Sequence, residues 1–257
     1  MFHVVIPARF ASTRLPGKPL LDIGGKPMIQ RVVEQACASG AGEVLVATDD
    51  ARIAEAVSDP RRRGQRIAIM TDPDLPSGTD RVAAVAELRD WSDETVVVNV
   101  QGDEPFLPPA LVDQVADLLV RDPAAGIATL AAPIGRLEEF MDPNVVKVVT
   151  ARDGSALYFS RAPIPWSRDG APDGLASQRD FAGAMRHIGL YAYRVGALRS
   201  ITRMSPSGLE NRERLEQLRS LENGVRIIVG SCIVLPGPGV DTEADLQRAR
   251  MAVSLRA

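Results

Sequence analysis

The chain has 257 residues, of which 45% are hydrophobic, so it can bury one sizeable core and is compatible with a single α/β domain. Its formal charge of -3 and its pI near 5.6 exclude a general electrostatic attraction to nucleic acid or to an anionic membrane. The sequence contains no apolar run long enough to span a bilayer and no basic, apolar leader. We therefore expect a cytoplasmic protein with no stable membrane association.

Strand and helix patterns alternate through the first half of the chain. Short apolar runs at 4–6, 44–47, 67–70 and 96–100 are typical of buried strands, and helical patterns follow each of them. The run 96–100 is apolar nearly throughout, which indicates cover on both faces and hence a parallel sheet. Four strand–helix alternations are complete near residue 121. The pattern predicts an α/β fold with a Rossmann-like, mostly parallel sheet flanked by helices.

The second half is less regular. Residues 127–134 and 145–151 are predicted strands, and the Asp153-Gly154 turn predicts a β-hairpin with 156–159. A loop with a short helix is expected over 168–184, a strand over 187–193, one amphipathic helix over 209–221 and a last strand over 226–234. Thr242 and Asp245 have the spacing of a capping box for a final helix. We expect one domain over 1–257, with a nucleotide-binding part at about 1–121 and a second part at about 122–257 that carries the small hairpin lobe.

Two charged loops follow predicted strands. The first strand leads into a loop with Arg9, Arg14 and Lys18, and the strand 96–100 leads into an acidic loop with Asp103. In an open α/β sheet, ligands lie outside the carboxyl ends of the strands, so the cations would hold an anionic ligand such as phosphate. Mg²⁺ prefers one or two protein carboxylates together with phosphate oxygens, and Asp103 with Asp241 would provide them. Neither a P-loop nor a dinucleotide fingerprint is present, so a different nucleotide-binding scheme is expected.

The order of several motifs resembles that of the 3-deoxy-manno-octulosonate (Kdo) cytidylyltransferases. The matching segments run from residue 4 to residue 242 in the order of that family. They are 4–19 (VVIPARFASTRLPGKP), 24–29 (GGKPMI), 46–49 (VATD), 77–81 (SGTDR), 99–105 (NVQGDEP), 158–161 (YFSR), 186–194 (RHIGLYAYR), 215–219 (LEQLR) and 239–242 (GVDT). The chain departs from the pattern at Asp80, where Glu is expected, and its 168–184 loop matches poorly.

The resemblance implies an Mg²⁺-dependent nucleotidyltransferase that converts CTP and Kdo into CMP-Kdo and diphosphate for lipopolysaccharide assembly. The fold it implies is that of the nucleotide-diphospho-sugar transferases, and family precedent together with the hairpin suggests a homodimer. By resemblance, Arg9, Lys18, Asp103 and Asp241 are catalytic, and the two Asp residues bind Mg²⁺. The residues implied to bind the nucleotide are Ala8, Arg9, Lys18, Ser77, Gly78, Thr79, Arg81 and Gln101. Those implied to bind the sugar acid are Arg161, His187, Tyr191, Glu216 and Gln217.

Some alternatives remain open from the sequence. The substrate's carboxylate calls for a planar guanidinium, which Arg161 or Arg186 could supply. For His187 the competing interpretation is a structural core histidine. The acid could also be another 2-keto sugar acid, such as 8-amino-Kdo or a sialic acid. A non-catalytic CTP-binding protein of the same fold is a further alternative, which the presence of both Asp103 and Asp241 disfavours.

Overall fold

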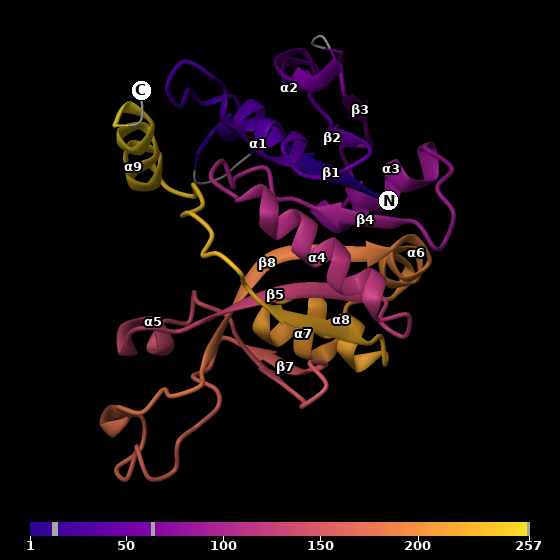
Figure 1. Cartoon of the computed structure of the whole chain (residues 1–257). Helices are drawn as coiled ribbons and strands as arrows, with labels where there is room; N and C mark the ends of the chain where they lie inside the picture. Colours follow the sequence, from indigo (N-terminus) through magenta and orange to yellow (C-terminus); the bar gives the residue numbers. More distant parts are fainter. Residues whose placement is uncertain (12–14, 63–64, 256–257) are drawn as a thin grey trace.

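The computed structural model describes residues 1–11, 15–62 and 65–255 (Figure 1). Within them, nine strands form one sheet in the order β3-β2-β1-β4-β8-β5-β9, with the β6–β7 hairpin joined to β8. The strands are β1 (Phe2–Ala8), β2 (Val44–Thr48), β3 (Ala68–Met70), β4 (Val96–Asn99), β5 (Ile127–Pro133), β6 (Lys147–Thr150), β7 (Ala156–Ser160), β8 (Met185–Arg194) and β9 (Ile227–Ser231).

Helices connect the strands and cover the sheet. The α-helices are α1 (Met28–Cys37), α2 (Ala51–Ala56), α3 (Gly78–Leu88), α4 (Pro109–Arg121), α5 (Leu137–Met141), α6 (Val195–Arg203), α7 (Gly208–Glu213), α8 (Gln217–Glu222) and α9 (Glu243–Ser254). Short 3₁₀ helices occur at η1 (Lys18–Leu20), η2 (Pro60–Arg62) and η3 (Leu175–Ser177). None of the helices in the described parts of the chain is long and apolar enough to cross a membrane.

The first half of the sheet is parallel, as its apolar strands predict. β1 lies between β2 and β4 and runs parallel to both, with Val4 opposite Val44 on one side and Val98 on the other. All residues of β2 and β4 are buried. Since parallel strands end at the same edge, the basic loop after β1 and the acidic loop after β4 open side by side. The prediction that these loops share one edge is confirmed.

The long strand β8 joins the two halves of the sheet. It runs antiparallel to β4 and to β5, and Tyr191 lies opposite both Asn99 and Thr129. The sheet is therefore mixed around β8, whereas β5 and β9 are again parallel. Through this pairing, side chains from the second half of the chain stand next to the end of β4.

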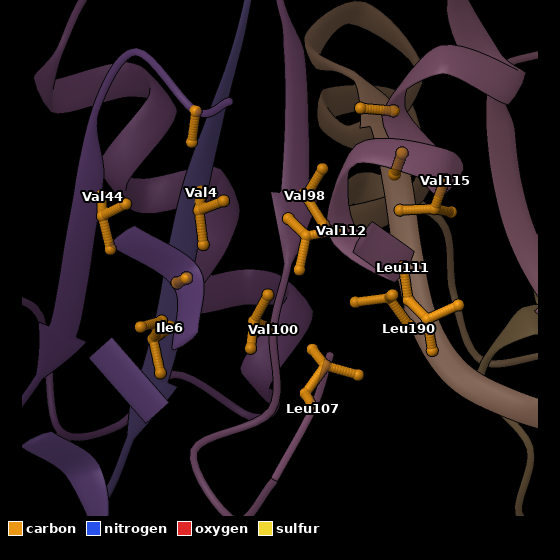
Figure 2. Close-up of a cluster of buried hydrophobic side chains, with 14 of the residues drawn as sticks. Val4, Ile6, Val44, Val98, Val100, Leu107, Leu111, Val112, Val115 and Leu190 are labelled. Carbon is orange, nitrogen blue, oxygen red and sulfur yellow. The ribbon is translucent and has the colours of Figure 1, made fainter. Parts of the chain in front are cut away.

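Two apolar layers hold helices against the sheet. One layer packs α1 and α4 on β1, β2, β4 and β8, and Figure 2 shows its side chains gathered between the strands and α4, including Val98, Val112 and Leu190. The other layer packs α3, α6 and α8 on the opposite face, around Phe159 and Val97. Each buried aliphatic side chain contributes about 1.5–3 kcal/mol relative to full exposure, so these layers supply most of the stabilisation.

The chain returns to the first half at its end. The segment after β9 leads to α9, which lies near α1 (Figure 1), and Leu246 of α9 packs in one small cluster with Met28 of α1. The predicted capping box is present, because the Thr242 hydroxyl accepts from the Asp245 N–H while the Asp245 carboxylate accepts from the Thr242 N–H. This return carries Asp241 to the edge where β1 and β4 end.

Several predicted elements differ in detail. The helix expected over 209–221 is two helices, α7 and α8, because Arg214 adopts a left-handed conformation with φ 54° and ends α7. The predicted hairpin is confirmed as β6 paired with β7, and the 168–184 segment is irregular with one 3₁₀ turn, as expected. The sequence did not predict α5 and α6.

Candidate active site

Lys18 joins the two predicted metal-binding carboxylates. Its Nζ donates to Asp103 Oδ2 at 2.7 Å and to Asp241 Oδ1 at 2.9 Å. Burial alone would lower the pKa of Lys18, but the charges and hydrogen bonds of Asp103 and Asp241 raise it above its usual value. Three residues far apart in the sequence thus form one charged centre at the sheet edge, as predicted.

Local backbone geometry fixes this centre. A Cβ on Gly102 would lie 2.9 Å from the carbonyl oxygen of Pro7, so only glycine lets the acidic loop pack closely on the end of β1. The N–H of Val240 donates to the carbonyl of Asp103 at 2.9 Å, which ties the C-terminal segment to the same loop. Gly17, with φ 68°, turns the basic loop just before Lys18.

A cavity of about 330 Å³ opens over this centre. It is lined by Ala8, Arg9, Lys18, Gln101, Asp103 and Asp241, among others. The Arg9 guanidinium donates to the carbonyl of Leu75, which fixes one of its nitrogens and orients the group. Arg14, predicted to be part of the basic loop, lies outside the described residues. Two cations and two carboxylates around one cavity suit a polyphosphate that carries a divalent cation.

A second cavity, of about 230 Å³, adjoins the first. Gln101 lines both cavities. The second cavity is lined by the predicted nucleotide-binding residues Ser77, Gly78 and Thr79 and the predicted sugar-binding residues Tyr191, Glu216 and Gln217. The structure therefore brings most of the predicted site residues to two connected hollows.

The start of α3 forms one wall of the second cavity. Ser77 caps the helix, with its hydroxyl accepting from the Asp80 N–H at 3.2 Å and its own N–H donating to Asp80 Oδ2 at 3.0 Å. Asp80, where the resemblance leads us to expect Glu, thus completes a capping box. Thr79 Oγ1 donates to Glu216 Oε2 at 2.9 Å and links this wall to α8. The departure from the family pattern keeps the local structure intact.

Arg81 is not among the described residues that line either cavity. Its side chain is fully buried, and its guanidinium donates to Thr71 Oγ1 at 2.6 Å and to Asp49 Oδ2. Burial is the main cause that lowers the pKa of Arg81 below its usual value. Arg81 braces the loops after β2 and β3, behind the wall that Ser77 and Thr79 present. Its direct contact with a nucleotide remains a prediction.

His187 is an uncharged ring next to Tyr191. Its Nε2 lies 2.9 Å from Thr129 Oγ1, and that hydroxyl donates to the carbonyl of Leu190 at 2.8 Å. The hydroxyl therefore accepts from His187, and Nε2 carries the ring proton. Packing against Phe159 and Tyr191, at centroid distances of 5.0 and 5.2 Å, leaves the ring only partly exposed, and its desolvation lowers the pKa of His187 to about 3.

Arg161 binds main-chain carbonyls. Its Nε donates to the carbonyl of Glu213 at 2.7 Å and its Nη1 to the carbonyl of Pro143 at 3.0 Å. The Arg161 carbonyl in turn accepts from Lys147 Nζ at 2.7 Å. Neither of the two cavities above includes Arg161 among its described lining residues. In this conformation Arg161 holds α7 against β7.

Glu104 is a charged group that the sequence did not single out. It lines a third cavity, of about 180 Å³, together with Gln101, Arg186, His187 and Gly189. Burial, and then the negative charges of Asp103 and Asp241, raise the pKa of Glu104 to about 7. Its position directly after Asp103 in the acidic loop was a signal available in the sequence.

The residues present fit a magnesium ion. Among the described residues, no group of three or more His, Cys, Asp or Glu side chains could hold a metal. Asp103 and Asp241 nevertheless direct carboxylate oxygens at the same position, which the Lys18 ammonium occupies in this structure. Two hard oxygen donors at an open cavity match the preference of Mg²⁺ for few protein ligands, with phosphates and water completing its shell.

Comparison with known proteins agrees with this site. The family model described as Cytidylyltransferase matches residues 3–227. A 3-deoxy-manno-octulosonate cytidylyltransferase of Methylococcus capsulatus is 55% identical over 256 residues, covering 99% of this chain and 98% of the relative. One of Thioalkalivibrio sulfidiphilus is 53% identical over 247 residues, covering 96% of each chain.

A solved structure has the same fold over its whole length. It is a CMP:2-keto-3-deoxy-manno-octonic acid synthetase in complex with CTP, with 42% identity, a TM-score of 0.86 and 99% of each chain covered. The motifs, the fold and the two connected cavities therefore have one explanation. The chain is a nucleotidyltransferase that belongs to the cytidylyltransferase family, among the 3-deoxy-manno-octulosonate cytidylyltransferases.

Proposed function

We propose that this enzyme transfers the CMP group of CTP to Kdo, releasing diphosphate and activating the sugar acid for lipopolysaccharide synthesis. The observation that carries the proposal is the Lys18 ammonium between Asp103 and Asp241, at the junction of two cavities that share Gln101. The names of relatives that match nearly the whole chain support the choice of CTP and Kdo.

The cavity over the charged centre holds the triphosphate. Arg9 and Lys18 offset the charge that grows on the departing diphosphate, and phosphoryl transfer requires little more than such neutralisation and positioning. The adjoining cavity presents the C2 hydroxyl of the sugar acid to the α-phosphorus, in line with the leaving group. The reaction forms one P–O bond and breaks another, and the hydroxyl proton leaves to solvent.

Asp103 and Asp241 would hold Mg²⁺ in this proposal. When bound there, the ion supplies charge neutralisation on the phosphates and lowers the pKa of the attacking hydroxyl. Asp103 is about one third exposed and Asp241 about one half, so both remain accessible from the cavity. The Lys18 ammonium keeps the two carboxylates near one another before substrates arrive.

In this proposal, the sugar acid is held by uncharged and acidic side chains from the second half of the chain. Tyr191, Glu216 and Gln217 line the second cavity, and hydroxyl groups of a sugar can donate to the Glu216 carboxylate. His187 is neutral and serves as a hydrogen-bonding and packing group. Arg161 fixes α7 against β7 through its carbonyl contacts.

We also propose that the enzyme is a homodimer in the cytoplasm. Large apolar side chains are exposed on the hairpin and on the protruding segment after it, at Leu157, Trp166 and Leu175. A second copy of the chain would cover such side chains. The thiol of Cys37, which donates to Asp59 at 3.5 Å, suits a reducing compartment. If sedimentation at micromolar concentration shows only a monomer, the proposed homodimer is refuted.

The test is a matrix of substrates. Purified protein with Mg²⁺ is offered CTP, UTP, ATP or GTP, each with Kdo, 8-amino-Kdo or N-acetylneuraminate, and diphosphate release is measured. We expect release with CTP and Kdo, and loss of release when Mg²⁺ is chelated. If diphosphate is released with CTP and another sugar acid instead, the proposed reaction stands and the proposed acid substrate is wrong. No release with any pair would refute the proposed function.

A further inference from the structure

The loop after β1 lies beside the start of α2, because β1 and β2 are parallel neighbours. Ala8, the last residue of β1, is opposite Thr48, the last residue of β2. Phe10 follows Ala8 by two positions, and Asp50, the N-cap of α2, follows Thr48 by two. Loops that leave parallel strands in register begin side by side at one edge of the sheet. The fold therefore brings Phe10 and the first turn of α2 together.

Arg52, in the first turn of α2, stacks its guanidinium on the ring of Phe10. The Arg52 Cζ lies 3.5 Å from the ring centroid, within the range of a cation–π contact. The Asp50 carboxylate holds the guanidinium there, because Oδ1 accepts from Nε at 3.0 Å and Oδ2 accepts from Nη2 at 2.6 Å. These hydrogen bonds keep the pKa of Asp50 below its usual value, so the pair stays charged at neutral pH. The in-plane N–H groups bind the carboxylate, and the flat face of the guanidinium remains for the ring.

Phe10 also contacts the C-terminal end of the basic loop. A Cβ on Gly17 would lie 3.2 Å from both Cε2 and Cζ of the Phe10 ring, so the ring packs directly against this glycine. Gly17 is buried and has a φ of 68°, a conformation that favours glycine. Any other residue at this position would be strained and would crowd the ring. One ring thus bridges the residue that follows Arg9 and the residue that precedes Lys18.

The Phe10 ring points away from the cavity that its neighbours line. Arg9 and Ala11 are among the described residues around the cavity over the charged centre, and Phe10 is not. The ring packs instead against the apolar layer that α1 and α4 form with the sheet. From this position Phe10 acts on a ligand through Arg9 and Lys18.

We propose that Phe10 and Arg52 are positioning residues, which hold the two cations of the basic loop in place before CTP binds. The inference rests on the proposed function, which puts the triphosphate beside those cations, Arg9 and Lys18. The Phe10 ring closes the basic loop between its two ends, and Arg52 covers the ring and ties it to α2. A loop that is already held in its binding conformation loses less conformational entropy when the ligand binds. The Phe10–Arg52 contact should therefore strengthen the binding of CTP through its phosphates.

The expected effect depends on which part of the nucleotide the basic loop faces. In the proposed function, Arg9 and Lys18 bind the two phosphates that leave as diphosphate. CMP lacks these two phosphates, so its binding should not depend on an ordered basic loop. When only a fraction of the molecules has the loop in its binding conformation, the apparent dissociation constant for CTP rises by the inverse of that fraction. Loss of the Phe10–Arg52 contact should therefore weaken the binding of CTP and diphosphate and spare that of CMP.

The test measures binding of CTP, diphosphate and CMP by isothermal titration calorimetry, with Mg²⁺ present and no sugar acid. Phe10→Leu removes the flat ring and keeps an apolar side chain, and Arg52→Gln removes the cation from an exposed position. We expect the dissociation constant for CTP to rise about 10-fold in Phe10→Leu and about 3-fold in Arg52→Gln, the range of one lost cation–π contact. The constant for diphosphate should rise in parallel. The constant for CMP should change less than about 2-fold, because CMP does not need the ordered loop.

Three further variants complete the design. Phe10→Tyr keeps the ring and should bind CTP as the wild type does, and Arg121→Gln, which removes an exposed arginine paired with Asp117 on α4, should do the same. The double variant Phe10→Leu/Arg52→Gln should bind CTP no more weakly than Phe10→Leu alone, because Arg52 acts through the ring. The inference is refuted if CTP binding is unchanged in Phe10→Leu or in Arg52→Gln, if CTP and CMP weaken equally, or if the two effects add in the double variant. Wild-type protein that binds CTP no more tightly than CMP would instead overturn the proposed function.

Discussion

Replacing Lys18 by Met removes the ammonium and keeps most of the aliphatic chain. The Asp103 and Asp241 carboxylates then face each other without the cation that binds both at 2.7 and 2.9 Å. A hydrogen bond to a charged group is worth about 1.5–3 kcal/mol when buried, and an exposed ion pair about 0–1 kcal/mol. Lys18 is 14% exposed, Asp103 33% and Asp241 49%, so we place the Asp103 contact in the first class and the Asp241 contact in the second.

We therefore expect Lys18→Met to lower the free energy of unfolding by about 2 kcal/mol without divalent cations at low salt. For a chain of this size that is a shift of roughly 4–8 °C in Tm. Urea denaturation followed by circular dichroism measures the change. Lys26→Met is the control, because Lys26 pairs with Glu34 at 2.7 Å on the surface with half of its side chain exposed. The control should lose less than about 0.5 kcal/mol.

Magnesium should partly restore the stability that Lys18→Met loses. Without the ammonium, the two carboxylates should gain more stability from millimolar Mg²⁺ than they do in wild type, because Lys18 no longer competes with the ion for their oxygens. Adding Asp103→Asn to Lys18→Met should abolish that gain. If Lys18→Met is no less stable than Lys26→Met, and Mg²⁺ stabilises all variants equally, the Lys18 centre is not the metal site and the reasoning is wrong.

Three further predictions concern other parts of the site. Asp103→Asn should lower kcat at least about 100-fold, since a metal contact contributes several kcal/mol to the transition state, with the fold retained by circular dichroism; near-normal turnover would contradict the metal assignment. Gly102→Ala should cost about 1–3 kcal/mol of stability and most of the activity, because its Cβ would meet the Pro7 carbonyl oxygen at 2.9 Å; an unchanged Tm would argue against this close approach. The His187 ring, with its pKa lowered to about 3, should stay neutral in NMR titrations down to about pH 4. Since the folded state resists protonation of this ring, stability should be complete above pH 6.5 and fall by about 2 kcal/mol by pH 5 from this residue alone, a loss that His187→Gln should remove.

The sequence predicted the parallel half of the fold and the charged edge well. Apolar runs such as 96–100 mark buried strands, and loops that follow parallel strands share an edge by geometry. Lys18 and Asp103 could therefore be placed together from the sequence, whereas Asp241 was a candidate whose role rested on the resemblance. The resemblance supplied the order of the motifs and the chemistry of both substrates.

The second half was harder to predict because its structure depends on distant contacts. The pattern over 209–221 is continuous, whereas in the structure contacts of Glu213 with Ser160 and Arg161 accompany a break at Arg214. Likewise, the insertion of β8 between β4 and β5 is a pairing of segments far apart in the chain. Periodicity identifies such a strand but does not identify its neighbours.

The directions in which side chains point could not be predicted from the sequence either. Arg81 is one of the predicted nucleotide-binding residues, yet its guanidinium turns inward to Asp49 and Thr71. Arg161 follows β7 in a motif assigned to the sugar acid, yet it binds the carbonyls of Glu213 and Pro143. A motif gives the position of a residue along the chain, whereas its partners come from loops that the motif does not contain.

The most direct measurement is ³¹P NMR of the purified enzyme with Mg²⁺, CTP and Kdo. The account predicts a new phosphodiester resonance of CMP joined to the acid, together with diphosphate in equal amount. A Kdo analogue that lacks the C2 hydroxyl should give neither signal. Diphosphate that accumulates with free CMP and no phosphodiester would mean hydrolysis instead of transfer, and would contradict the central claim.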